Sequence, residues 1–178
     1  MEVVSVSKSA RHHFSKELCS SIFLVEGLGV EGDCHSGKTV QHLSRIAVDP
    51  TQPNLRQVHL IQAKLLDELD LTDFKISFGE LGENIITRGL DLLSLPRCTL
   101  LMIGERAVVE ITGLRNPCQQ IEMFQQGLLS KLVFKSQDGS IVRKSGIMAI
   151  VKVSGSVAPG ERVVVELPSL PHIPLDRV

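Results

Sequence analysis

Short apolar runs that are repeatedly interrupted by glycine and proline are the feature that most constrains the fold of this chain. Runs such as Leu100–Ile103 and 147–151 have the length of strands and are far too short to span a bilayer. Only two segments show helical periodicity, so strands and helices do not alternate along the chain. A doubly wound parallel sheet requires that alternation. We therefore expect a mainly β, α+β fold, in which a β-barrel or twisted sheet carries short peripheral helices.

The spacing of apolar residues and the positions of turn residues predict where the strands and helices lie. Strands are expected within residues 2–9, 20–33, 56–62, 98–114 and 146–167. One helix is indicated by the four-residue spacing of Ile61, Leu65 and Leu69, and a second one by a single apolar face made of Ile121, Phe124, Leu128 and Leu132. The length of 178 residues suits one domain over 1–178, whose proline-rich residues 168–178 form an extended C-terminal tail.

Composition and charge exclude several classes of partner. The net charge is −1 and the chain has six Phe but no Trp or Tyr, so it offers neither a basic field nor stacking platforms for nucleic acid. The N-terminus is polar, without an apolar segment of signal-peptide length. We therefore expect a cytoplasmic protein with no membrane partner, in which the four cysteines are reduced thiols.

The segment GDCHSGKT at 32–39 matches the phosphate-loop pattern G-x-x-x-x-G-K-[ST]. That motif needs a strand before it and a helix after it. Gly27 and Gly29 interrupt the preceding segment, and Pro50 limits the helix that could follow. We interpret the match as a glycine turn. The alternative, nucleotide hydrolysis, predicts ATP binding that is lost in Lys38→Ala.

Cys118 lies in the segment RNPCQQ, where the local sequence favours a reactive thiol. Asn116 is a favourable N-cap, Pro117 then takes the first helical position, and Gln119 can complete a capping box. Cys118 would then sit in the first turn of a helix, next to Arg115, where negative charge is favoured. The thiolate is the form that binds soft metals and attacks sulfur. The alternative is a buried, inert cysteine, and the other three cysteines lack such a setting.

Three segments in this order resemble the MOSC domain family, the module named for its place at the C-terminus of molybdenum cofactor sulfurases. GVEGDCHSG at 29–37 resembles the family's glycine–aspartate–x–histidine loop, and this explains the phosphate-loop match. GELGENIITRGLDLLSLP at 79–96 resembles its G-x-x-G-E-N segment, and LMIGERAVVEITGLRNPCQQIEMF at 101–124 holds its Arg-x-Pro-Cys core. The closing strands at 145–165 also fit, so the resemblance spans about residues 27–165. Cys34 and the stretch 38–53 depart from the family pattern.

The resemblance implies a stand-alone MOSC domain with a β-barrel fold and a role in molybdenum cofactor chemistry. Cys118 would be the catalytic residue and the ligand of molybdenum, since a thiolate is a suitable soft ligand. The pterin of the cofactor ends in a phosphate, which needs fixed donors. The cofactor-binding candidates carried over by motif are Asp33, His35, Arg56, Glu83, Asn84 and Arg115, with Arg143 and Lys144 as weaker ones. The desulfurase domain of full-length sulfurases has no room in this chain, so we expect no pyridoxal phosphate.

Three functions are compatible with these features. The protein acts through Cys118 as a molybdenum-cofactor-dependent oxidoreductase or sulfur carrier, or it is a metal-free persulfide sulfurtransferase, or it is a non-catalytic module that shields the cofactor or docks on a partner. The expected partners are the pterin cofactor and a sulfur donor or an electron-transfer protein. A zinc site is not predicted, because no standard ligand spacing connects Cys34, His35, His12, His13 and His42.

Overall fold

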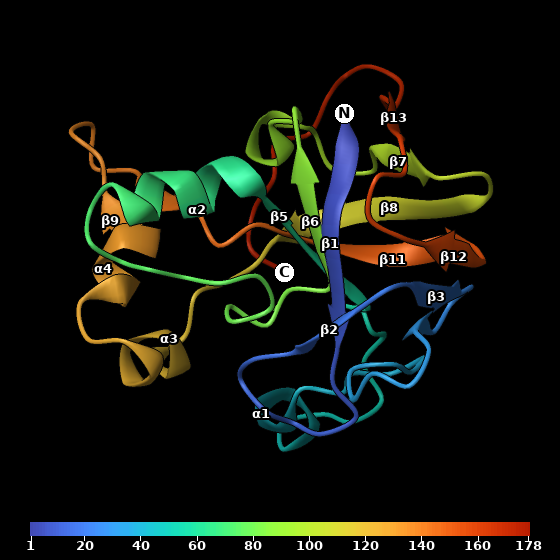
Figure 1. Ribbon diagram of the computed structural model, residues 1–178, viewed down its shortest axis with the longest axis horizontal. Coiled ribbons are helices and arrows are strands. Elements are labelled where there is room, and N and C mark those ends of the chain that lie inside the picture. Colours follow the sequence, from blue (N-terminus) through green and yellow to red (C-terminus); the bar gives the residue numbers. More distant parts are fainter.

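The computed structural model describes all residues, 1–178, and its main element is one eight-stranded sheet (Figure 1). The strand order is β13-β7-β8-β11-β5-β6-β1-β2, and every pair is antiparallel except β5–β6. The bounds are β1 (Glu2–Lys8), β2 (Glu17–Cys19), β5 (Val58–Gln62), β6 (Ile85–Arg88), β7 (Leu100–Ile103), β8 (Ala107–Leu114), β11 (Ile147–Val153) and β13 (Val163–Glu166). A small sheet holds β12 (Gly155–Val157), β3 (Ile22–Val25) and β4 (Gly29–Val30), and another holds β9 (Val133–Lys135) and β10 (Ile141–Arg143).

The large sheet curves until β13 approaches β1, the neighbour of the end strand β2, but it does not close into a continuous ladder. The residues before β13 contact the start of β1 through an isolated bridge between Glu2 and Arg162. The Val3 amide also donates to the Glu161 carbonyl at 2.8 Å. The hydrogen-bonded order nevertheless ends at β13 and β2. A mostly β, α+β architecture is therefore confirmed, whereas the expected closed barrel is not.

Strand β5 is buried on both faces, which explains why its sequence is an almost continuous apolar run. Leu60 points into the larger hydrophobic cluster, within the curve of the sheet, whereas Ile61 belongs to a second cluster. On the neighbouring strand β6, Ile85 and Ile86 divide between the clusters in the same way. Successive side chains of a strand point to opposite faces, so the second cluster covers the outer face of the sheet. Helix α2 (Ala63–Asp70), which connects the parallel strands β5 and β6, packs there.

Of the two helices predicted from the sequence, one is confirmed and the other is not. The spacing of Ile61, Leu65 and Leu69 predicts α2, whose buried residues include Leu65 and Leu69, whereas Ile61 lies in the preceding strand β5. The single helix expected after Cys118 is wrong, because two short helices are present, α3 (Gln119–Phe124) and α4 (Leu128–Leu132). Gly127 lies between them with a φ of 84°, a left-handed conformation that ends a right-handed helix. The remaining helical turns are α1 (Leu43–Ile46) and the 3₁₀ turn η1 (Leu92–Ser94).

Residues 167–178 run back along the sheet as an extended segment. The Leu114 amide donates to the Asp176 carbonyl at 2.8 Å, and the Val178 amide donates to the Leu114 carbonyl at 3.2 Å. These bonds place the last residues of the chain beside the end of β8. That end of β8 is only a few residues before Cys118 in the sequence. None of the helices has the length and apolar character needed to cross a membrane.

Candidate functional site

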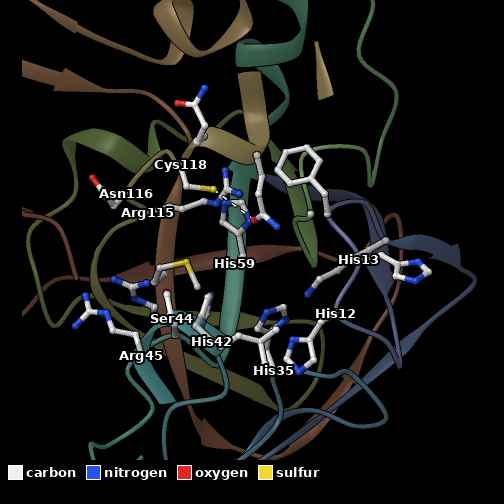
Figure 2. Close-up of a pocket in the computed structure, with 18 of the residues that line it drawn as sticks. His12, His13, His35, His42, Ser44, Arg45, His59, Arg115, Asn116 and Cys118 are labelled. Carbon is white, nitrogen blue, oxygen red and sulfur yellow. Dashed lines mark hydrogen bonds between the residues drawn. The ribbon is translucent and has the colours of Figure 1, made fainter. Parts of the chain in front are cut away.

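One cavity of about 570 Å³ gathers cationic and imidazole side chains together with Cys118 (Figure 2). Five of the six histidines line it, as do Lys16, Arg45, Arg56 and Arg115. No aspartate or glutamate is among the lining residues. In a chain whose net charge is only −1, this distribution makes the cavity a locally positive site suited to an anionic ligand.

The floor of the cavity is built by the register of neighbouring strands. Met148 on β11 pairs with His59 on β5, and both line the cavity. Asn84, which directly precedes β6, lies next to His59 and also lines the cavity. Its amide donates to the His59 carbonyl at 2.8 Å, and its Oδ1 accepts the His59 amide at 3.1 Å. Three residues that are distant in sequence therefore present their side chains to the same space because of strand pairing.

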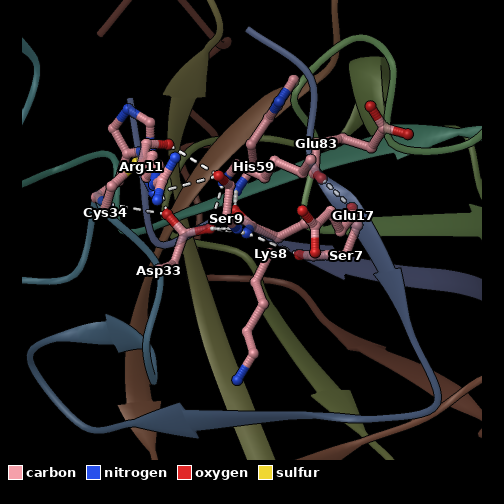
Figure 3. A network of polar contacts seen from close by, with 12 residues as sticks. Ser7, Lys8, Ser9, Arg11, Glu17, Asp33, Cys34, His59 and Glu83 are labelled. Atoms are coloured by element: carbon pink, nitrogen blue, oxygen red, sulfur yellow. Dashed lines mark hydrogen bonds and ion pairs between the residues drawn. The ribbon is translucent and has the colours of Figure 1, made fainter. Parts of the chain in front are cut away.

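Asp33 lies beneath the cavity wall and holds several of the lining residues in place (Figure 3). Its Oδ2 accepts Lys16 Nζ at 2.7 Å, Asn84 Nδ2 at 3.1 Å and the Ser9 amide at 3.2 Å. Its Oδ1 accepts the His35 amide at 2.9 Å and lies 3.2 Å from His35 Nδ1. Burial alone would raise the pKa of Asp33, but the His35 hydrogen bonds and the Lys16 charge hold that pKa well below its usual range. Asp33 is therefore an ionised positioning residue.

Cys118 lies on the cavity wall, directly before helix α3. The expected N-cap at Asn116 is wrong, because the helix begins at Gln119 and Cys118 itself is the N-cap residue. The chain stays extended through Arg115, whose amide donates to the Gly146 carbonyl at 3.0 Å, so a helical turn cannot begin there. The Cys118 thiol makes one long contact, donating to Gln120 Oε1 at 3.5 Å. The sulfur is half-buried and faces the cavity.

Arg115 and Cys118 lie side by side in the cavity (Figure 2). The Arg115 guanidinium carbon is 6.0 Å from the centre of the Phe14 ring, which packs against it. Burial lowers the pKa of Arg115, and the nearby ionisable groups of Cys118 and Glu83 oppose that change. Its Nη1 atom is buried and donates no hydrogen bond. Because buried donors are almost always satisfied, this atom indicates an acceptor that a ligand would supply.

Further positive charges crowd the same space. Burial, together with the charges of Arg45 and Arg115, lowers the pKa of Arg56 to about 10. Burial and the neighbouring His35, Arg56 and Arg115 lower the pKa of His42 to about 3, so this ring is neutral at pH 7. Arg56 also donates from Nη2 to the carbonyl oxygen of Val178. A bound anion would relieve the repulsion among these cations.

Only some of the site residues predicted from the sequence line the cavity. Cys118, His35, Arg56, Asn84 and Arg115 line the cavity, whereas Asp33, Glu83 and Arg143 do not.

The residues outside the cavity have other contacts. Glu83 is buried, its Oε1 accepts the Gly79 amide, and burial raises its pKa. Arg143 Nε donates to Asn116 Oδ1 at 3.4 Å, and Lys144 pairs with Glu68 at 3.0 Å.

Six charged or imidazole residues of the lining were not predicted as site residues from the sequence: His12, His13, Lys16, His42, Arg45 and His59. None of them stands in a motif. The only local signal for His59 is its place in a strand-like apolar run, which equally fits a core histidine. Lys16 is buried with only 3% of its side chain exposed, and burial lowers its pKa although Asp33 opposes the change. The sequence does not reveal such a position, because the partner carboxylate comes from another loop.

The arrangement has a definite chemical capacity. The cavity can bind a small molecule that carries an anionic group, through fixed guanidinium, ammonium and imidazole donors. It places one reachable thiol next to that group, as a soft ligand or a nucleophile.

Comparisons with known proteins agree with this reading of the fold. The YuaD protein of Bacillus subtilis has a crystal structure similar to this chain, with a TM-score of 0.74 and 22% identity over 94% of this chain and 96% of that one. YiiM from Geobacillus stearothermophilus has a TM-score of 0.63 and 16% identity over 97% and 76% of the two chains. YiiM from Escherichia coli has a TM-score of 0.62 and 16% identity over 97% and 73%. These likenesses concern the fold.

The sequence matches none of the curated proteins significantly. The family model of the MOSC domain, however, matches residues 11–164, which is most of the 178-residue chain. The chain therefore belongs to the MOSC domain family.

Proposed function

We propose that this protein binds the molybdenum cofactor in the cavity and that Cys118 acts there as the sulfur ligand of the metal or as a sulfur carrier. The observation that carries the proposal is the buried, unpartnered Nη1 atom of Arg115 in the same cavity as the Cys118 thiol. This pair places a hydrogen-bond donor for an anion next to a soft sulfur ligand. The phosphate of the molybdenum cofactor requires the first, and its metal requires the second.

The residues present fit such a group in size and charge. The volume of about 570 Å³ lies within the range of about 300–1,000 Å³ that is usual for cofactor sites. The lining has four cationic side chains and no carboxylate. Arg115, Arg56 and Lys16 would hold the phosphate, and a ring N–H such as that of His42 would donate a hydrogen bond to the pterin.

The bound cofactor would supply a metal centre able to accept and return electrons. The chain's own residues position it. Arg115 stabilises negative charge on the neighbouring sulfur and on the ligand, and the Asp33 network holds Lys16 and His35 against the cavity. His59 Nε2 donates to the Ser145 carbonyl at 2.7 Å, and burial lowers the pKa of this ring well below its ordinary value, so the ring is neutral. That ring can accept a proton only when a ligand or solvent reaches it.

The same thiol could act without metal as a persulfide carrier. In that reaction the Cys118 thiolate attacks the outer sulfur of a donor persulfide, a sulfur–sulfur bond forms at Cys118, and the donor leaves as a thiolate. Mass spectrometry after treatment with a persulfide donor would show one added sulfur at Cys118. An unmodified peptide would end this alternative.

Metal analysis tests the main proposal. The protein would be purified from a host that makes the cofactor, and molybdenum per chain would be measured by plasma mass spectrometry. We expect molybdenum in the wild type and in the control Cys98→Ser, since Cys98 is exposed and lies outside the cavity. We expect its loss in Cys118→Ala and a strong reduction in Arg115→Ala.

The possible outcomes separate the hypotheses. Absence of molybdenum from the native protein, and again after reconstitution with the isolated cofactor, would contradict the proposal. Retention of the cofactor by Cys118→Ala, together with unchanged partner binding, would instead support a non-catalytic module that shields the cofactor.

A further inference from the structure

We propose that His12, Cys34 and His35 form a zinc site on one wall of the cavity, with a fourth coordination position open to the cavity. Each of these residues offers one ligand atom, and the three atoms lie within 4.8 Å of one another. Cys34 Sγ is 3.3 Å from His35 Nδ1. On a tetrahedral zinc, with bonds of about 2.3 Å to sulfur and about 2.05 Å to nitrogen, these two ligands would be about 3.6 Å apart.

The donor set suits zinc. One thiolate and two imidazoles are borderline-soft ligands, and three protein ligands with one open position are typical of zinc sites that bind a further molecule. His12 and His35 line the cavity, whereas Cys34 does not. In a metal site formed by all three residues, the Cys34 thiolate would therefore lie on the side of the metal away from the cavity. The open coordination position would face the cavity. The thiol proton would be released to solvent on binding.

The two segments that carry these residues are held together before any metal binds. The Cys34 amide donates to the Ser9 carbonyl at 2.7 Å, which joins the Cys34 loop to the segment that leads to His12. The His35 ring lies edge-on to His12, with ring centres 5.3 Å apart, and against His42 at 4.5 Å. Rings fixed in this way lose little freedom when they bind a metal.

A negative charge stands directly behind the cluster. The buried Asp33 carboxylate is 3.2 Å from His35 Nδ1, the same atom that faces Cys34 Sγ, so on zinc binding it would lose its hydrogen bond to that nitrogen and act on the cation as a nearby charge. This charge offsets part of the charge of the cation in an otherwise positive cavity. Figure 3 shows Asp33 and Cys34 side by side, and Figure 2 shows His12 and His35 away from Cys118. The zinc site is thus separate from the thiol of the proposed cofactor site.

The test is a zinc titration of the full chain after removal of metals with EDTA. Binding would be followed by calorimetry, and bound zinc would be counted by plasma mass spectrometry. We expect one zinc per chain, bound at least about tenfold more weakly by Cys34→Ser and His12→Ala. The matched controls His13→Ala and Cys98→Ser should bind as the wild type does. His13 is an exposed neighbour of His12 outside the cluster.

Cobalt provides a second readout that identifies the sulfur ligand. The Co²⁺ form should show a near-ultraviolet thiolate-to-cobalt band that disappears in Cys34→Ser and persists in Cys118→Ala. Zinc binding below one per chain, or binding that Cys34→Ser leaves unchanged, would overturn the proposal. A band lost only in Cys118→Ala would also overturn it, because the metal would then be bound elsewhere.

This inference and the proposed function fail independently. Cys34 does not line the cavity, so Cys34→Ser should keep its molybdenum. Cys118→Ala should keep its zinc. Far-ultraviolet circular dichroism and urea unfolding of Cys34→Ser would establish that it folds, as expected, because the backbone amide of Cys34 rather than its sulfur attaches the loop.

Discussion

The buried His59 should make the protein lose stability as the pH falls, by an amount that follows from its environment. Only 4% of the residue is exposed, and its Nε2 donates to the Ser145 carbonyl at 2.7 Å. Burial and the charge of Arg115 lower the pKa of His59 well below its ordinary value of 6.5. The folded protein therefore keeps this ring neutral at a pH where the unfolded chain binds a proton.

The sign and size of the effect follow from this difference in proton binding. Above pH 6.5 neither state binds the proton at His59, so the residue adds no pH dependence. Below pH 6.5 the unfolded state binds one proton more, and the free energy of unfolding falls by about 1.4 kcal/mol per pH unit. Integrated between pH 7.5 and pH 5.5, with 6.5 as the unfolded pKa, His59 accounts for a loss of about 1.4 kcal/mol.

Urea unfolding of the wild type and of His59→Gln at the two pH values measures this loss. Glutamine can keep a donor near the Ser145 carbonyl but cannot titrate. EDTA in all samples removes any contribution from bound metal, and the other histidines contribute equally to both proteins. The loss of stability in the wild type should exceed that in the variant by about 1.4 kcal/mol. Equal pH dependence in the two proteins, with equal m-values, would refute the reasoning.

Two further predictions concern stability. Lys16→Met should lower the free energy of unfolding at pH 7 by about 3–5 kcal/mol, because it leaves the buried Asp33 carboxylate without its cation; the double variant with Asp33→Asn should recover part of that loss in urea unfolding. Gly146→Ala should cost clearly more than Gly139→Ala in thermal unfolding. Both glycines have a positive φ, which strains alanine by about 1–2 kcal/mol, but a Cβ at Gly146 would also clash with the Leu60 carbonyl oxygen, whereas Gly139 faces open space.

The elements that could be predicted from the sequence are those whose determinants are local. Strands β7 and β8 follow from two apolar runs around the turn at Gly104, and α2 follows from Leu65 and Leu69. The break between α3 and α4 was missed, although Gly127 stands in the middle of the expected helix. Apolar spacing continues across that glycine, and spacing alone does not reveal that the backbone there is left-handed. The pattern of the side chains and the conformation of the backbone are separate determinants.

The curvature of the sheet could not be predicted in the same way. It depends on contacts such as the bridge between Glu2 and Arg162, which joins residues near opposite ends of the chain. A barrel and an open curved sheet have the same strand sequences and differ only in whether the last ladder forms. The β-rich architecture can therefore be predicted from the sequence, whereas the end of the ladder at β2 and β13 is seen only in the structure.

The same distinction between local and long-range determinants applies to the residues of the site. Cys118 and Arg115 could be named from one short segment, because they are neighbours in sequence as well as in the cavity. His59 could not, since its exposure to the cavity depends on its pairing with Met148, which is set by the register of β11 against β5. The motif around Asp33 marks its loop, but it does not reveal that the carboxylate points beneath the wall toward Lys16.

The proposed zinc ligands show why a spacing rule fails in this fold. Such rules detect sites in which one turn or one helix supplies pairs of ligands at short, regular intervals. Here two ligands are adjacent on one loop, and His12 comes from a segment that the hydrogen bond between the Cys34 amide and the Ser9 carbonyl brings alongside. The interval between His12 and Cys34 is set by the small strands β2, β3 and β4, which have no part in binding. A change in the length of those strands would alter the spacing and leave the ligand geometry intact, so the geometry rather than the spacing is the evidence for a metal.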